Sequence, residues 1–300
     1  MFFLHFFKLK SRFLINSAIL KNMIKLIGID LDGTLLYPKR HLTVLIRKNT
    51  NFLKRFIAKG GKVIFVSGRN PMMQKKVEKK VGAQIPILCC NGSFLYKDGE
   101  VSNNSPIPTN TAIELYSKMK KKFGILAWVL LDSTSHMYTT FHNIGGFLST
   151  LIKFVNFISL QYREHITYGE KEFVKALKNG ENYKIMPVFG LGKKGKNSAE
   201  QAYTAIKDLF GDQVSVFLSD SAIEISALNT SKGIGLKKYA EENNIDLDEI
   251  AVIGDSGNDI SMFEITKNSF AMSHAPKFVK EKANYIVDRV FNMEEYIDKL

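Results

Sequence analysis

Two aspartates separated by one residue could do chemistry in Asp-Leu-Asp-Gly-Thr, which begins at Asp30 directly after the apolar run 24–29. Successive side chains of a strand alternate between its faces, so Asp30 and Asp32 leave the strand on the same side. Two carboxylates this close repel each other unless a cation or a shared proton lies between them. Gly33 permits a sharp turn, and a solvated Asp-Gly turn is the alternative that needs no chemistry.

A second acidic group follows another apolar run, residues 250–253, and contains Asp255 and Asp259. These carboxylates could meet Asp30 if the two apolar runs form neighbouring strands. Hard oxygen ligands without His or Cys suit Mg²⁺ rather than Zn²⁺. The alternative is a helix start that a short polar side chain caps.

Three further polar groups stand beside apolar runs. Ser67 and Gly68 follow the run 62–66, and a hydroxyl with backbone N–H groups before a helix makes a natural phosphate cradle. Lys232 begins a predicted helix, where lysine is unfavourable for the helix dipole. Asn91 ends a third apolar run. Ordinary turns and an exposed lysine are the alternatives for these positions.

The elements that must position these residues alternate in type. The hydrophobic pattern predicts strands at 24–29, 62–66 and 85–90, with helices over 43–59 and 71–81 between them. This order predicts a parallel sheet with crossover helices. Ligands of such sheets bind at the carboxyl ends of the strands, which is where the polar groups stand.

The pattern changes between residues 93 and 222, where short strands with antiparallel character mix with helices, one of them over 145–160. The parallel pattern resumes at Ala222. We therefore expect an α/β protein, with a Rossmann-like parallel-sheet core formed by residues 23–92 and 223–300. An α+β domain formed by residues 93–222 interrupts this core.

The composition is that of a folded chain with excess positive charge. The 300 residues are 45% hydrophobic and 24% charged, which excludes collagen-like and wholly disordered chains. The formal net charge of +13 favours an anionic partner, which is nucleic acid, an acidic membrane or a phosphorylated small molecule. The sequence contains no run of about 18 apolar residues, so we expect no membrane span. The adjacent Cys89 and Cys90 fit neither a disulfide framework nor a zinc site, and favour a reducing, cytoplasmic compartment.

The segment 1–22 contains four basic residues and no acidic one, and Met23 directly precedes the first predicted strand. We expect this segment to be an extension outside the core or to precede the natural start. Organellar targeting and a membrane-surface helix are the alternatives.

The order of the motifs resembles that of the haloacid dehalogenase superfamily. The motifs are Asp-x-Asp-Gly-Thr at 30–34, Ser-Gly-Arg at 67–69, Lys-Gly at 232–233 and Gly-Asp-x-x-Asn-Asp at 254–259. The insert resembles the large α/β cap of the Cof-type phosphatases in this superfamily. The resemblance spans residues 23–300.

The resemblance implies a Mg²⁺-dependent phosphatase of small phosphorylated metabolites, such as sugar phosphates. Asp30 would attack phosphorus and form an aspartyl-phosphate, and Asp32 would act as general acid and then as general base. The Asp30 carboxylate, the Asp32 backbone carbonyl and Asp255 would hold Mg²⁺, with Asp259 behind them. Lys232 would stabilise charge on the transferred group.

The resemblance also implies that Ser67, Gly68 and Asn91 hold phosphate oxygens beside Lys232, with Asn258 as a further candidate. The cap would supply specificity. His274 stands where Asn is usual in the family, which puts a substrate role at that position in doubt.

Asp32 favours a phosphatase or phosphomutase over a transport ATPase or a dehalogenase, which lack this acid. The alternatives are a phosphosugar mutase with a similar cap and a non-catalytic regulatory or binding protein that retains the fold. A nucleic-acid-binding module is a third alternative, although we expect no nucleic acid partner.

Overall fold

The structure is a computed structural model that describes residues 23–37, 45–71, 74–134, 136–142, 165–190, 192–219 and 222–299. The N-terminal segment 1–22 and the predicted helix over 145–160 lie outside the described residues. The described chain forms two compact units. The first contains the residues up to Phe65, Lys80–Ala83 and those from Leu236 onward, and the second contains Val66–Lys79 and Gln84–Gly235.

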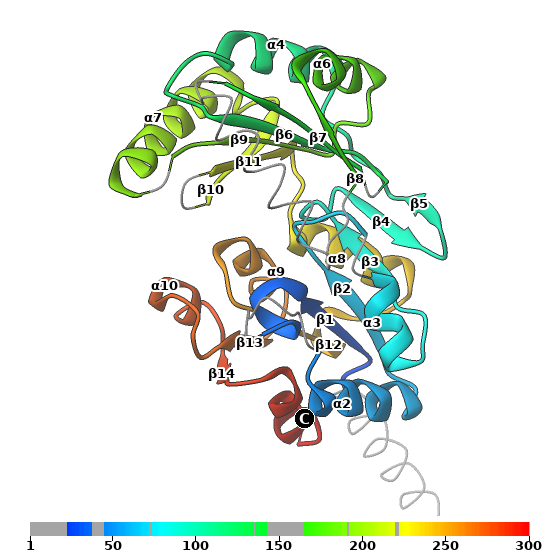
Figure 1. The fold of residues 1–300 in the computed structure, drawn as a ribbon. Coiled ribbons are helices and arrows are strands. Elements are labelled where there is room, and N and C mark those ends of the chain that lie inside the picture. Colours follow the sequence, from blue (N-terminus) through cyan, green and yellow to red (C-terminus); the bar gives the residue numbers. More distant parts are fainter. Residues whose placement is uncertain are drawn as a thin grey trace, which may run out of the picture. The chain divides into compact units, whose positions relative to one another are not determined.

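Eight strands form one sheet in the order β14-β13-β12-β1-β2-β3-β4-β5 (Figure 1). Their bounds are β1 Leu26–Asp30, β2 Lys62–Val66, β3 Ile87–Cys89, β4 Phe94–Lys97, β5 Glu100–Ser102, β12 Ile250–Gly254, β13 Asn268–Met272 and β14 Tyr285–Val287. The pairs β1–β12, β12–β13 and β13–β14 are parallel, whereas β3, β4 and β5 pair in antiparallel fashion. The predicted parallel-sheet core is therefore confirmed.

The adjacent strands β1 and β12 are buried along their whole length. Strands covered on both faces are continuous apolar runs rather than alternating ones, and both strands stand in the sequence as such runs. Gly28 of β1 permits a close approach, because a Cβ there would lie 2.8 Å from the side chain of Leu236. Leu236 belongs to α8, so this glycine brings that helix onto β1.

Helices and short turns follow the strands of this sheet. Their bounds are η1 Leu31–Leu35, α2 Arg47–Ala58, α3 Gln74–Val81, α8 Lys232–Glu242, η3 Leu247–Glu249, η4 Gly257–Asp259, α9 Ile260–Phe263, α10 Lys277–Lys280, η5 Val290–Met293 and α11 Glu294–Ile297. The predicted helix over 43–59 corresponds to α2, whose Phe52, Leu53 and Phe56 are buried. It ends where Gly60 adopts a positive φ of 90°.

The second sheet has six strands in the order β10-β11-β9-β6-β7-β8. Their bounds are β6 Ala127–Leu131, β7 His136–Phe141, β8 His165–Tyr168, β9 Lys184–Val188, β10 Val214–Ser219 and β11 Ala222–Ala227. The helices α4 (Thr109–Met119), α6 (Glu170–Asn179) and α7 (Gly192–Phe210) lie on one side of it (Figure 1). Apart from the parallel pair β7–β8, the strand pairs of this sheet are antiparallel.

Strand β11 differs from the sequence expectation. The parallel pattern was expected to resume at Ala222, but β11 pairs in antiparallel fashion with β10 and β9. Its alternate residues Ile223 and Ile225 point into the core of the second sheet. The strand lies directly before α8 in the chain. A local sequence pattern does not indicate which strands it pairs with, so the expectation was wrong.

The core of the second sheet forms around Trp128, which is fully buried. Its ring contacts Tyr116 edge-on, with ring centroids 5.3 Å apart, and Tyr116 also packs on Phe173. The helices α4 and α6 therefore meet β6 through aromatic side chains. None of the described helices is long and apolar enough to cross a membrane.

Candidate active site

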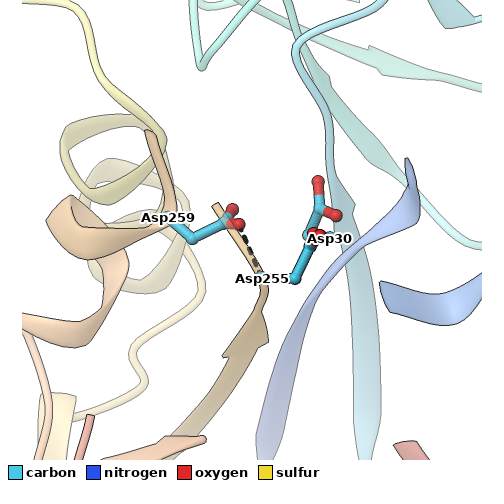
Figure 2. A group of neighbouring side chains, drawn as sticks. All are labelled: Asp30, Asp255 and Asp259. Carbon is cyan, nitrogen blue, oxygen red and sulfur yellow. Dashed lines mark hydrogen bonds between the residues drawn. The ribbon is translucent and has the colours of Figure 1, made fainter. Parts of the chain in front are cut away.

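Three aspartates of the first unit converge (Figure 2). Asp30 is the last residue of β1, Asp255 follows β12, and Asp259 is the last residue of η4. Each offers a carboxylate oxygen that lies within 4.8 Å of the other two. The cause is the register, because Ile29 of β1 pairs directly with Ile253 of β12 and the two strands end together. The expectation that these carboxylates meet if their strands are neighbours is met by the geometry.

The Asp259 carboxylate is fixed by hydrogen bonds within its own turn. Its Oδ2 accepts from the backbone N–H groups of Asp255 and Ser256, both at 2.9 Å, and from the Ser256 hydroxyl at 3.1 Å. Ser256 and Asp259 form a capping box, so the turn is also a helix start. The same turn therefore both caps a helix start and contributes carboxylates to the acidic group.

The turn after Asp30 is shaped to support Asp255. Gly33 has a positive φ of 88°, and a Cβ at this position would lie 2.3 Å from Oδ2 of Asp255. Thr34 is buried and its hydroxyl donates to Oδ1 of Asp255 at 3.1 Å. Asp32 lies in the same turn with extended backbone angles and a partly exposed side chain. The motif therefore supplies the Asp30 carboxylate. Its Gly33 and Thr34 also support the Asp255 carboxylate.

The donor set of this acidic group fits a hard divalent cation. Two carboxylates within 4.8 Å of each other repel by at least about 3 kcal/mol at an effective dielectric constant of about 20. Asp30 and Asp259 are buried, so bulk water screens them poorly. Carboxylate oxygens are the ligands that Mg²⁺ prefers, and the space that a Cβ at Gly33 would fill is left open beside Asp255.

In the second unit, the segments that follow β2 and β3 are joined by backbone hydrogen bonds. Asn91 N–H donates to the Ser67 carbonyl at 3.0 Å, and Ser67 N–H donates to the Leu88 carbonyl at 2.8 Å. The Ser67 hydroxyl accepts from the Arg69 N–H at 3.1 Å. Ser67 and Asn91, two of the predicted phosphate-binding residues, therefore lie side by side and buried.

Residues 90–92 form a tight left-handed turn at the end of β3. Cys90, Asn91 and Gly92 have positive φ angles of 49°, 59° and 86°. Such angles are costly for residues other than glycine and are found mostly where the surroundings enforce them. The enforcement is visible at Gly92, where a Cβ would lie 2.4 Å from the Ser231 carbonyl oxygen.

Lys232 begins α8 directly after Ser231 and is 1% exposed. The alternative of an ordinary exposed lysine is therefore excluded. The contact between Gly92 and Ser231 places the segment with Lys232 against the turn with Asn91. A buried ammonium here lies where an anion would gain from it.

Two charged residues that the sequence analysis did not single out adjoin these segments. Lys184 of β9 and Glu224 of β11 form an ion pair at 2.7 Å, with side chains 4% and 15% exposed. Lys184 donates to the Gly68 carbonyl at 2.9 Å, and the Asn91 side-chain amide donates to Glu224 at 2.7 Å. No local pattern marks either residue, since each occupies an ordinary strand position.

Burial of Glu224 raises its pKa, but Lys184, Asn91 and Lys232 stabilise the carboxylate more strongly, so that the net pKa is lowered. Glu224 is thus held ionised beside the predicted phosphate-binding residues. For the thiols the effect of burial prevails, and it raises the pKa of Cys90 to about 12 and that of Cys89 well above its usual value. Both thiols therefore stay protonated near neutral pH and are structural.

His274 lies beside the acidic group. Its Nε2 is 3.5 Å from Oδ2 of Asp255, and its ring stacks on Tyr37 with centroids 3.8 Å apart. Arg289 lies over the other ring of this stack, 4.9 Å from the Tyr37 centroid. Asn258 accepts a hydrogen bond from the Ser256 hydroxyl at 2.7 Å, within the turn that holds Asp259.

Similar proteins were found by sequence and by structure. Residues 27–292 match the family of haloacid dehalogenase-like hydrolases. A protein of Mycoplasma genitalium that is named a phosphatase is 30% identical over 279 residues, covering 86% of this chain and 89% of its own. A pyridoxal phosphate phosphatase of Escherichia coli is 24% identical over 266 residues, covering 88% of this chain and 93% of its own.

A solved structure of a HAD/COF-like hydrolase from Plasmodium vivax has the same fold, with a TM-score of 0.75 and 23% identity. The match covers 93% of this chain and 97% of that one. The motif order, the two sheets and the extent of these matches agree. The chain belongs to the haloacid dehalogenase-like hydrolases of the Cof type, whose relatives here are named phosphatases.

Proposed function

We propose that this protein is a Mg²⁺-dependent phosphatase that hydrolyses small phosphorylated metabolites through an aspartyl-phosphate. The observation that carries the proposal is the convergence of Asp30, Asp255 and Asp259 within 4.8 Å at the ends of two adjacent parallel strands. A nucleophilic carboxylate can approach an anionic phosphate only where the charge of both is offset.

In the proposed reaction, an Asp30 oxygen attacks phosphorus and the bond from phosphorus to the leaving alcohol breaks. Asp32 gives its proton to that alcohol. Asp32 then takes a proton from water, which attacks phosphorus, and the bond between Asp30 and phosphorus breaks. Inorganic phosphate leaves, and both aspartates return to their starting state.

We propose that Ser67, Gly68, Asn91 and Lys232 hold the phosphate oxygens, with Asn258 as a weaker candidate. The contacts within the second unit support this assignment, because Asn91 N–H donates to the Ser67 carbonyl at 3.0 Å and Gly92 closely approaches Ser231, the residue before Lys232. The burial of Lys232 supports a role for its ammonium in stabilising charge on the transferred group.

Mg²⁺ would be held by the Asp30 and Asp255 carboxylates and the Asp32 backbone carbonyl, with Asp259 behind them. When bound, the cation offsets the charge that separates the Asp30 carboxylate from the phosphate. In support, Asp259 already accepts three hydrogen bonds through Oδ2, so its contribution is to hold the 255–259 turn in place.

We propose that the second sheet with α4, α6 and α7 is the cap that selects the substrate. We propose that the insert that forms it begins near residue 93 and, because β11 pairs within the second sheet, includes residues up to about 227. We further propose that the enzyme acts in the cytoplasm on soluble phosphate esters. The relative named for pyridoxal phosphate supports a small phosphorylated metabolite as the substrate.

The test is hydrolysis of p-nitrophenyl phosphate and of a panel of sugar, nucleotide and pyridoxal phosphates with Mg²⁺. We expect turnover of the aryl ester, a higher kcat/KM for one class of metabolite, and complete loss of turnover in excess chelator that Mg²⁺ restores. Turnover that persists in chelator would refute the metal site. Activity that requires a sugar bisphosphate would instead identify a phosphomutase.

A further inference from the structure

The ion pair between Lys184 and Glu224 has no part in the reaction described above, although both residues contact the segments proposed to bind phosphate. We infer that this pair positions the phosphate donors, with Glu224 orienting the Asn91 amide and Lys184 orienting the Gly68–Arg69 peptide next to Ser67. This inference rests on the proposed function and names two further residues that serve it.

The pair stands on the side of the second sheet that faces away from its apolar core. The neighbours Ile185, Ile223 and Ile225 point into that core. Alternation along the strands therefore directs Lys184 and Glu224 to the opposite face. The register pairs Ile225 with Ile185, which makes Lys184 and Glu224 diagonal neighbours on this face.

Glu224 fixes one phosphate donor directly. The Asn91 amide has two N–H groups, and one of them donates to Glu224 Oε2 at 2.7 Å. That bond fixes the plane of the amide. Because the amide is planar, the direction of its second N–H is then fixed as well. Asn91 already has the positive φ of 59°, so backbone and side chain are both constrained.

Lys184 fixes the other donor through one peptide unit. Its ammonium donates to the Gly68 carbonyl at 2.9 Å, and the N–H of the same peptide, from Arg69, donates to the Ser67 hydroxyl at 3.1 Å. A planar trans peptide holds its C=O and N–H in opposite directions, so fixing one fixes the other. A hydroxyl that accepts from Arg69 can give its own proton to a phosphate oxygen.

The charges of the pair explain why both members are needed. A single buried charge is strongly disfavoured, whereas a pair with additional hydrogen bonds is tolerated. Each member has one such bond to a proposed phosphate-binding segment, and Lys232 adds to the stabilisation of Glu224. The pair thus orders two donors without bringing net charge to the phosphate.

The experiment is a double-mutant cycle with Glu224→Ala, Asn91→Ala and the combination, together with the charge-free variant Lys184→Met/Glu224→Leu. Glu114→Ala is the matched control, because it breaks an exposed ion pair with Lys118 on α4 of the same unit. For each variant we would measure kcat and KM on p-nitrophenyl phosphate, the inhibition constant of inorganic phosphate, and the thermal midpoint.

We expect Glu224→Ala to raise KM and the phosphate inhibition constant about tenfold, as for one hydrogen bond to a charged group, with a much smaller change in kcat. In the Asn91→Ala background the same change should have less than about twofold effect, since the interaction partner is gone. The charge-free variant should fold and bind phosphate as weakly as Glu224→Ala, whereas Glu114→Ala should match the wild type.

Equal effects of Glu224→Ala with and without Asn91 would overturn the inference, as would wild-type phosphate affinity in the charge-free variant. In either case a wild type that turns over would leave the proposed function intact. A wild type that neither hydrolyses phosphate esters nor binds phosphate would instead refute the proposed function, and this inference with it.

Discussion

At the scale of single residues, Thr34 shows how the aspartate motif reaches beyond its own carboxylates. Its hydroxyl donates to Asp255 Oδ1 across 221 positions of sequence. The Asp-x-Asp-Gly-Thr motif therefore includes, besides its two carboxylates, a group that orients a proposed metal ligand. Replacing a side chain that orients a metal ligand typically lowers metal affinity or activity by about 10- to 100-fold.

Replacing Thr34 with Val should weaken Mg²⁺ binding, because it removes the donor and keeps the shape of the buried side chain. One hydrogen bond to a charged group contributes about 1.5–3 kcal/mol, so we expect the half-saturating Mg²⁺ concentration to rise about tenfold or more. The measurement is phosphatase activity against Mg²⁺ concentration. Thr111→Val, which removes a hydrogen bond to Gln213 in the other unit, should leave that curve unchanged. Equal curves for Thr34→Val and the wild type would contradict this role.

Cys90 should make the protein less stable at alkaline pH. Burial raises its pKa in the folded state from 9.0 to about 12. Above pH 9 the unfolded chain therefore releases the thiol proton while the folded chain keeps it, and folding loses about 1.4 kcal/mol per pH unit until pH 12. Urea unfolding at pH 8 and pH 10 should show a larger loss for the wild type than for Cys90→Ala. An equal loss in the two proteins would show that the thiol ionises normally.

At the scale of elements, the left-handed turn 90–92 holds the end of β3 against the start of α8. The contact depends on Gly92, whose missing side chain lets the Ser231 carbonyl approach. Replacing Gly92 with Ala should force these two segments apart and weaken phosphate binding, with a loss of stability that exceeds the strain of the positive φ alone.

Gly82→Ala is the matched control, because Gly82 also has a positive φ, of 76°, but nothing lies within 4 Å of a Cβ there. Placing alanine in the left-handed conformation costs about 1–2 kcal/mol, and this is all that we expect for Gly82→Ala. Chemical denaturation and the phosphate inhibition constant give the comparison. If Gly92→Ala behaves like Gly82→Ala in both assays, the contact with Ser231 has no role in the site.

The parallel core could be predicted from the sequence because buried parallel strands are continuous apolar runs, as 250–253 and 62–66 are. The polar residues that follow these runs, Asp255 and Ser67 among them, could be identified for the same reason. The placement of β11 could not, because its pairing with β9 and β10 depends on contacts between distant segments. Glu224 was missed with it, since only that pairing brings its carboxylate to Asn91.

At the scale of the whole molecule, the chain shares its two-sheet architecture with Cof-type hydrolases over nearly its full length. Excess positive charge of +13 fits an enzyme that attracts phosphate esters, which concentrate near a positive surface. Within this fold the reaction is proposed to depend on one carboxylate, Asp30, which forms the cation site together with its neighbours.

The most direct measurement is chemical trapping of the phosphorylated enzyme. Wild-type protein would be mixed with excess aryl phosphate and Mg²⁺, quenched in acid, reduced with borohydride and digested, and the peptides analysed by mass spectrometry. Reduction converts an aspartyl-phosphate to homoserine, so we predict homoserine at position 30 and at no other aspartate. Asp30→Asn should show neither homoserine nor turnover, while Asp298→Asn, which alters an exposed ion pair with Lys59, should behave as wild type. Homoserine at Asp32 instead of Asp30, or turnover by Asp30→Asn, would contradict the account.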